Sequence, residues 1–345
     1  MKKIIIYFCG FTIMFFIVPA ICTVSPPKEE TQETVGYEQT QSTDDSQQNQ
    51  ADGLEQVEMP SESSIKLLRS NSGEVQELTI NEYLYGVVSS EMPANFEVEA
   101  LKAQAVVART YTIYQIINND SKHENADICD NYACCQAWIT KEERLAKWKP
   151  EEAENNWNKI IEAVNSTNEK IITYEGAPIN AFFHANSGGV TESSLNIWGG
   201  IDYPYLKSVE TTGEDGYTQY ASQFVLNQQE LLEKIKTKYE DCEIDFAQEN
   251  CIQILEYTSS GRVKTIKFGN KEIAGTEART LLGLKSTNFT FSKDGENITF
   301  SVKGYGHGVG MSQTGADALA KKGSNYEAII KHFYTNVEIT EVNSL

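Results

Sequence analysis

A helix that is apolar on more than one face is the feature that most constrains the fold of this chain. Residues 97–117 have helical character, and the stretch Ala103-Gln104-Ala105-Val106-Val107-Ala108 within them has almost no polar side chains. Such a helix has to be surrounded by other elements, because an exposed face would leave apolar surface in water. We therefore expect it at the centre of a globular domain.

The flanking sequence supplies elements that could surround this helix. Thr79 followed by Glu82 has the spacing of a capping box and predicts the start of a helix. Period-2 alternation and turn residues predict the strands. The predicted helices are 80–90, 151–165, 317–321 and 326–333, and the predicted strands are 65–69, 75–78, 171–174, 181–183, 289–291 and 298–302. This mixture predicts the α+β class, with a single mixed globular domain over 63–345 that contains a substrate cleft.

The N-terminal residues predict a membrane anchor and a spacer. Two lysines precede an apolar run from Ile4 to Val24, which is long enough to cross a bilayer and would leave the remainder outside the cell. We predict a single-pass signal anchor at 1–24. A cleaved signal peptide and a lipoprotein at Cys22 are the alternatives. Residues 25–62 contain ten acidic residues and one lysine, which predicts a disordered linker that acts as a spacer.

Charge and motif content exclude several classes of function. With 29 Lys and Arg against 49 Asp and Glu, the net charge is −20, which argues against nucleic acid as a partner. No glycine-rich segment has the spacing of a phosphate-binding loop, so we expect no organic cofactor. Seven cysteines are too few for a disulfide scaffold. Cys242 and Cys251 are interpreted equally well as a disulfide or as free thiols.

Glu91 is the first candidate for chemistry. It lies at the predicted end of the helix 80–90, where the helix dipole and apolar neighbours would both raise the pKa of a carboxyl. A carboxyl that stays protonated near neutral pH can act as a general acid. The alternative is a solvated glutamate at a helix end.

Arg109 lies inside the apolar helix, where a buried guanidinium needs a partner. That partner is either a structural carboxylate or a group of a substrate. Direct pairing with Glu91 would lower the pKa of the carboxyl and oppose an acid role.

Three thiols and an imidazole lie within 13 residues, at His123, Cys129, Cys134 and Cys135. This spacing is typical of a closed tetrahedral metal site, which predicts a structural ion, with zinc the default and iron the alternative for sulfur-rich ligands. The site would pin the insertion 118–138. A vicinal disulfide and buried free thiols with an exposed histidine are the alternatives.

Two glycine-rich segments, HANSGG at 184–189 and GYGHGVGMSQ at 304–313, complete the candidates. Dense glycines allow a backbone to approach a ligand or to form tight turns. A nucleophilic pair of Ser187 and His307 is conceivable, but nothing in the sequence requires it.

Four segments of this chain resemble the motifs of a single family, and they occur in the same order as in that family. YLYGVVSSEMP at 83–93 and ALKAQAVVARTY at 100–111, followed by the two glycine-rich segments, resemble the stage II sporulation protein D (SpoIID) family over roughly residues 65–340. The resemblance implies a lytic transglycosylase that cuts the MurNAc–GlcNAc bond of peptide-stripped peptidoglycan strands. It implies 1,6-anhydro-MurNAc ends, a role in forespore engulfment, and as partners a SpoIIP-type amidase and a SpoIIM-type membrane protein.

The resemblance also assigns residues. The catalytic glutamate of the family falls on Glu91 and its helix arginine on Arg109. The residues expected to hold the glycan are Arg109, Ser187, Lys207, His307 and Gln313. Some members bind zinc through His, Cys and an adjacent His-Cys pair, which fall here on His123, Cys129, Cys134 and Cys135, so Cys134 departs from that pattern.

Two other functions compete with the transglycosylase. In the first, the domain is a non-catalytic glycan-binding module that activates a cell-wall amidase. In the second, it is a metal-dependent hydrolase that uses His184, Glu192 and His307.

Overall fold

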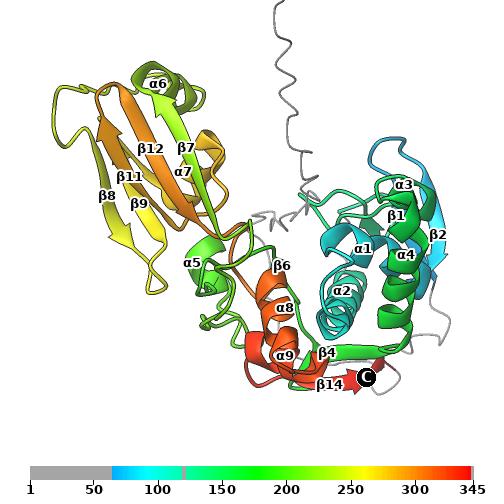
Figure 1. Ribbon diagram of the computed structural model, residues 1–345. Helices are drawn as coiled ribbons and strands as arrows, with labels where there is room; N and C mark the ends of the chain where they lie inside the picture. Colours follow the sequence, from blue (N-terminus) through cyan, green and yellow to red (C-terminus); the bar gives the residue numbers. More distant parts are fainter. Residues whose placement is uncertain (1–63, 119–121, 343–345) are drawn as a thin grey trace, which may run out of the picture. The chain divides into compact units, whose positions relative to one another are not determined.

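The computed structural model describes residues 64–118 and 122–342, so the predicted anchor at 1–24 and the linker at 25–62 lie outside the described residues. Within the described ranges, no helix combines the length and the apolar character required to span a bilayer. All of these residues belong to one compact unit of mixed α and β structure (Figure 1).

The first part of the unit is built mainly from helices. It contains β1 (Ser64–Leu68), β2 (Val75–Thr79), α1 (Ile80–Glu91), α2 (Val98–Ile117), β3 (Ile128–Cys129), α3 (Lys141–Leu145), α4 (Pro150–Asn165), β4 (Lys170–Tyr174), β5 (Ala177–Pro178), β6 (Phe183–His184) and α5 (Ser194–Trp198). The predicted capping box is present, because Thr79 accepts from the Glu82 N–H and Glu82 accepts from the Thr79 N–H.

Helix α2 has the central position that its sequence predicts. Thirteen of its twenty residues are buried, and it packs against α1, α4, α8, α9 and β4 (Figure 1). Two of these partners of α2, the helices α8 (Gln313–Lys321) and α9 (Tyr326–Phe333), come from the C-terminal part of the sequence. The strand that follows them, β14 (Glu338–Glu341), pairs with β4. These elements enclose the first hydrophobic core.

Residues 221–303 contain a second core, and of its elements only the β11–β12 hairpin was predicted from the sequence. Its elements are β7 (Ala221–Asn227), α6 (Gln228–Lys236), β8 (Ile252–Tyr257), β9 (Val263–Phe268), β10 (Lys271–Ala274), α7 (Gly275–Leu282), β11 (Phe289–Asp294) and β12 (Asn297–Lys303). The β11–β12 hairpin was predicted, but β7 adds to it from 70 positions earlier, pairing Asn227 with Asn297. Together these strands form the sheet β11–β12–β7, beside the sheet β10–β9–β8.

The chain returns from the second core through the glycine-rich segment 304–313. Strand β13 (Met311–Ser312) then pairs in parallel with β6, which places Ser312 beside His184. This pairing brings the two glycine-rich segments of the sequence together, as isolated bridges at Asn186–Tyr305 and Glu192–Val309 also show.

Candidate active site

Glu91 is the last residue of α1 and its side chain turns into the protein. Met92 is extended and precedes Pro93, which disfavours a helical residue before it and so ends the helix. Only 2% of Glu91 is exposed. Oε1 accepts a hydrogen bond from the main-chain N–H of Ala137 at 2.8 Å, whereas Oε2 has no hydrogen-bond partner in the described ranges.

This environment favours the neutral carboxyl. Burial raises the pKa of Glu91 to about 8, although the Ala137 N–H and the Gln313 amide both act to lower it. No carboxylate is among the groups that shift the pKa of Glu91. At neutral pH the side chain therefore holds a proton that it can donate, which is the requirement for a general acid.

Gln313 connects this carboxyl to α2 and α8. It is the first residue of α8, it is buried, and its Nε2 donates to Gln104 Oε1 on α2 at 3.4 Å. The C-terminal end of the glycine-rich segment is thereby placed at the candidate site. Among the predicted glycan-binding residues, Gln313 is the one that interacts with Glu91.

His307 and His184 form a second buried group on the same segments. Their ring centroids are 5.6 Å apart, and Trp198 lies 5.2 Å from His307. His184 Nδ1 lies 3.0 Å from the Val309 carbonyl and so carries a proton, whereas His307 Nδ1 accepts from the Val309 N–H at 3.0 Å. Burial, then the nearby Arg262 charge, lowers the pKa of His184 to about 4, and burial also lowers the pKa of His307. Both rings are neutral at physiological pH.

Ser187 belongs to a buried hydroxyl network around Glu214, a residue that the sequence analysis did not single out. Ser187 and Thr211 donate to Glu214 Oε2 at 2.5 and 2.8 Å, and Thr314 donates to Oε1 at 3.0 Å. Burial acts to raise the pKa of Glu214, but the hydrogen bonds from Ser187, Ser312 and Thr211 outweigh it and lower the pKa. The contacts of Ser187 are with this network, and no hydrogen bond joins it to His307 among the described residues.

Arg109 has main-chain partners. Nη1 donates to the carbonyls of Thr167 and Lys170 at 2.7 and 3.1 Å, and Nη2 to that of Val164 at 3.3 Å. Its side chain is 99% buried and joins α2 to the end of α4. Nη2 also lies 3.5 Å from Asn81 Oδ1, and the Glu169 carboxylate acts electrostatically on the guanidinium. The expected contact with a substrate stays a prediction. The carbonyls at a helix end have no partner within the helix, and Arg109 supplies one.

Lys207 lies on the surface, and its Nζ pairs with Asp202 at 3.1 Å. The third hydrolase candidate, Glu192, is buried and accepts hydrogen bonds from four groups: the N–H of Ser193 and the side chains of Asn196, Thr258 and Ser260. Each oxygen of the Glu192 carboxylate accepts two of these hydrogen bonds. They tie the β8–β9 turn to the segment before α5.

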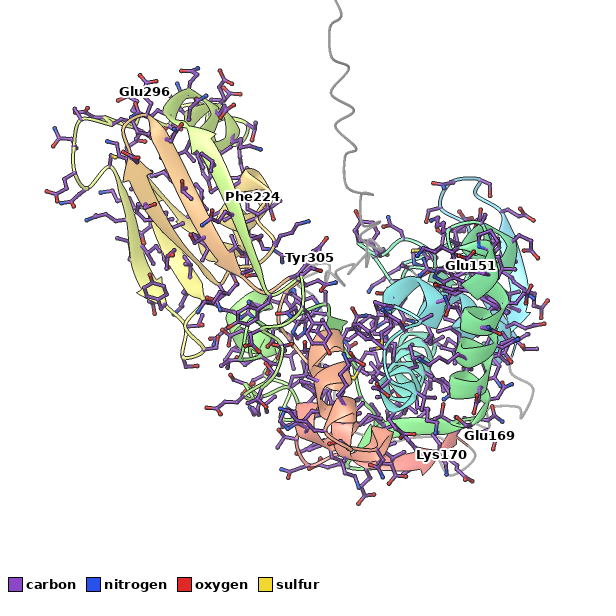
Figure 2. All side chains as sticks on the ribbon, in the orientation of Figure 1. Glu151, Glu169, Lys170, Phe224, Glu296 and Tyr305 are labelled. Carbon is purple, nitrogen blue, oxygen red and sulfur yellow. The ribbon has the colours of Figure 1, made fainter. Side chains whose placement is uncertain are left out.

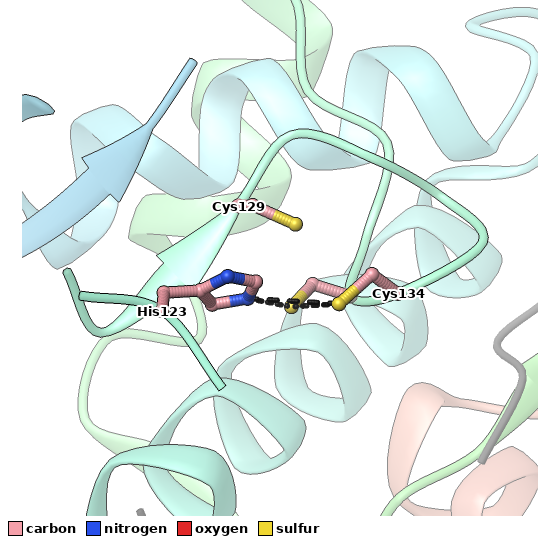
Figure 3. Close-up of side chains that lie close together, drawn as sticks. His123, Cys129 and Cys134 are labelled. Atoms are coloured by element: carbon pink, nitrogen blue, oxygen red, sulfur yellow. Dashed lines mark hydrogen bonds between the residues drawn. The ribbon is translucent and has the colours of Figure 1, made fainter. Parts of the chain in front are cut away.

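The predicted metal ligands converge on one point. The ligand atoms of His123, Cys129, Cys134 and Cys135 all lie within 4.8 Å of one another, and Figure 3 shows the imidazole directed at the thiols. His123 Nε2 lies 3.2 Å from Cys135 Sγ and 3.6 Å from Cys134 Sγ, and the two sulfurs are 3.8 Å apart. No other cluster of three such residues occurs in the described ranges. Cys242 and Cys251 are buried free thiols.

Two further residues escaped the sequence analysis. Ala137 acts through its main-chain N–H, which no side-chain motif reveals. Arg262 is 1% exposed and donates through Nη2 to the Ser187 and Val190 carbonyls at 2.7 and 3.3 Å. Arg262 directly precedes β9 and follows Gly261, so its neighbours in the sequence give no signal that this guanidinium is buried.

Comparison with known proteins identifies the family. The model of the SpoIID family, described as stage II sporulation protein, matches residues 69–174. Stage II sporulation protein D of Bacillus amyloliquefaciens is 33% identical over 345 residues, which are all of this chain and 97% of that protein. This chain belongs to the SpoIID family.

Other relatives agree with this membership in a family of sporulation proteins. Stage II sporulation protein D of Bacillus subtilis (strain 168) is 34% identical over 282 residues, 81% of this chain and 80% of that protein. The amidase enhancer of Bacillus subtilis is 30% identical over 305 residues, 74% of this chain and 40% of that protein. The SpoIID match at 69–174 includes Glu91 and the Cys/His cluster.

Proposed function

We propose that this SpoIID-family chain is a lytic transglycosylase of peptidoglycan, with Glu91 as its catalytic acid and base. The observation that carries the proposal is the buried Glu91 carboxyl, whose pKa is raised to about 8 and whose Oε2 has no partner in the described part of the chain. A glycosidase that uses water ordinarily needs two carboxylates. Here the groups that shift the pKa of Glu91 include no second one.

One carboxyl suffices when the nucleophile belongs to the substrate. Protonated Glu91 gives its proton to the oxygen that leaves MurNAc C1, and the bond between C1 and this oxygen breaks. The 6-hydroxyl of the same MurNAc attacks C1, and the Glu91 carboxylate takes the hydroxyl proton. No water is consumed, the product is a 1,6-anhydro end, and Glu91 is again protonated. Proximity within one sugar replaces the second carboxylate.

The test compares wild type with Glu91→Gln on peptide-free glycan strands, using the full-length protein in detergent. We expect wild-type products that are lighter by one water molecule than hydrolysis products, and none from Glu91→Gln. Amide exchange of the variant establishes that it is folded. A folded Glu91→Gln protein that still cleaves would remove Glu91 from the mechanism, and hydrated products would indicate a glycosidase that uses water.

A second candidate is a glycan-binding activator of an amidase. The similarity to a protein named amidase enhancer favours it. It predicts that Glu91→Gln stimulates a SpoIIP-type amidase as well as wild type does. We also propose a membrane-anchored, extracytoplasmic location and a SpoIIM-type partner, for which the apolar residues 4–24 and the family resemblance are the support.

The Cys/His cluster fits a structural zinc ion. A tetrahedral site with zinc–sulfur bonds of about 2.3 Å places neighbouring ligand atoms about 3.8 Å apart. The separations among His123, Cys134 and Cys135 are 3.2–3.8 Å, and all four ligand atoms, with that of Cys129, lie within 4.8 Å of one another. The four residues would occupy all positions of the ion and leave none for water. When bound, zinc would clamp the insertion 118–138, and we assign it no part in bond cleavage.

A further inference from the structure

The sheet β11–β12–β7 has two faces of different character. On one face, Phe224, Phe300 and Phe291 lie side by side across the three strands and pack into the second core, with α6 against the same sheet. Successive side chains of a strand point to opposite faces, so the residues between these phenylalanines lie on the other face.

Two rows on this other face line a groove of about 610 Å³, together with Ser222, Phe289 and Val302, which lie between them along the strands. The register gives the first row as Ala221, Lys303 and Asn288, and the second as Gln223, Ser301 and Thr290. All but Asn288 are exposed. The rows lie at the end of the hairpin near Tyr305, away from the turn at Glu296, and Figure 2 labels both residues.

The lining defines the chemistry of a ligand. Amide and hydroxyl groups both donate and accept hydrogen bonds, as sugar hydroxyls and N-acetyl groups require. The lining contains no acidic residue, although the chain carries a net charge of −20. The Lys303 ammonium has no ion-pair partner in the described part of the chain and can bind a carboxylate. These groups match an N-acetylated sugar strand that carries occasional carboxylates.

We propose that this groove is a second glycan-binding site, which holds the strand outside the site of cleavage. The inference rests on the proposed function, because a peptide-stripped peptidoglycan strand combines N-acetyl groups, hydroxyls and the lactyl carboxylate of MurNAc. The groove is also continuous in sequence with the candidate site. Lys303 leads directly into the glycine-rich segment that ends at Gln313, next to Glu91.

The test measures binding by calorimetry, with the full-length Glu91→Gln protein in detergent as the host. The ligands are peptide-free peptidoglycan strands and chitin oligosaccharides of matched length, which lack the carboxylate. Ser301→Tyr fills the centre of the groove, and we expect at least about 10-fold weaker binding of both ligands. Lys303→Ala removes one exposed charge, and we expect about 3- to 5-fold weaker binding of the peptidoglycan strands alone. Lys236→Ala, on α6, is the matched control and should bind as the host does.

Unchanged affinity in both Ser301→Tyr and Lys303→Ala would overturn the second site. If Ser301→Tyr changes the sedimentation coefficient but not the glycan affinity, this face of the sheet is a contact between two copies of the chain. That result would also overturn the second glycan-binding site. Cleavage by wild type is measured separately on the same strands. If Ser301→Tyr and Lys303→Ala bind glycan more weakly but wild type does not cleave the strands, the groove is supported and the transglycosylase proposal is rejected. If wild type cleaves the strands but both variants bind as the host does, the groove is rejected and the transglycosylase proposal stands.

Discussion

The main-chain N–H of Ala137 donates to Oε1 of Glu91 at 2.8 Å, so the insertion that carries the Cys/His cluster also holds the candidate catalytic carboxyl. Ala137 follows the metal-ligand candidate Cys135 by two positions. Between them, Gln136 is fully buried and donates to Tyr83 of α1 and Thr112 of α2 at 3.2 and 3.0 Å. The insertion thus contacts the helix that bears Glu91 at several points.

The first prediction concerns the pH dependence of cleavage. A general acid has to be protonated, so activity should fall as pH rises through the pKa of Glu91, at about 8. The Gln313 amide lowers this pKa, and Gln313→Leu should therefore move the alkaline limb to higher pH. The measurement is the pH profile of kcat with peptide-free strands. An alkaline limb that stays in place in Gln313→Leu would show that the limb reports another group.

The second prediction concerns stability. Glu91 has a folded pKa raised above that of the unfolded chain, so between about pH 4.5 and 8 the folded state binds more protons. The contribution of Glu91 to the free energy of unfolding should then decrease with rising pH across this window, whereas the buried His184 and His307, whose pKa values are lowered, contribute in the opposite direction. Glu91→Gln removes the decrease and should stabilise the protein at pH 8 by a few kcal/mol, about 3–5 at most. Urea titrations at pH 5 and pH 8 test this, and an equal effect of Glu91→Gln at both pH values would contradict it.

The third prediction concerns the metal. Chelation, or Cys135→Ser, should loosen the insertion, release the Ala137 N–H from Glu91 and reduce cleavage. The direct measurement is amide exchange at Ala137, which should become faster. Cys242→Ser is the control, because it also removes a buried thiol, but in the second core. If the Ala137 amide exchanges as slowly in the chelated protein as in the untreated one, the Cys/His cluster does not hold the Ala137 N–H against Glu91.

Local signals made the first core predictable. The apolar stretch of α2, the capping box at Thr79 and Glu82, and the alternation of the β11–β12 hairpin depend on neighbours close in sequence. Strand β7 of the second core was not among the predicted strands, because it joins β12 from 70 positions earlier and its short alternating segment carries no signal of its partner. Glu91 and the Cys/His cluster were found from local patterns and the family resemblance.

The remainder of the site depends on contacts distant in sequence. Glu214 gains its role from hydroxyls up to 100 positions away, and Ala137 contributes only a main-chain group. The burial of Arg109 was predicted, but its partners are carbonyls of Val164, Thr167 and Lys170, which a search for charged partners does not reveal.

The fourth prediction separates structure from binding at Arg109 and Lys207. Arg109→Lys keeps the charge but loses the two-pronged geometry, and should destabilise the fold by about 2–4 kcal/mol with unchanged glycan affinity in the folded protein. Lys207→Ala breaks an exposed ion pair and should cost at most about 1 kcal/mol. If Lys207 holds the glycan as predicted, that variant weakens binding. Calorimetric titration measures the glycan affinity, and urea unfolding measures the free energy of unfolding. An Arg109→Lys protein with unchanged stability and reduced glycan affinity would show that Arg109 contacts the glycan.

The last prediction concerns the contact between Gly308 and Arg262. Gly308 has a φ of +86°, and a Cβ there would lie 2.4 Å from Arg262 Nη2, which is held by the Ser187 and Val190 carbonyls. Gly308→Ala therefore combines left-handed strain with a clash against a buried side chain that cannot move freely. We expect it to lower the free energy of unfolding by about 3 kcal/mol or more. Gly295→Ala, with a φ of +57° and open space around the new Cβ, is the control and should cost about 1 kcal/mol. Urea unfolding gives the free energy of unfolding of both variants. If Gly308→Ala and Gly295→Ala lose the same amount, the glycine-rich segment accommodates the new Cβ without displacing Arg262.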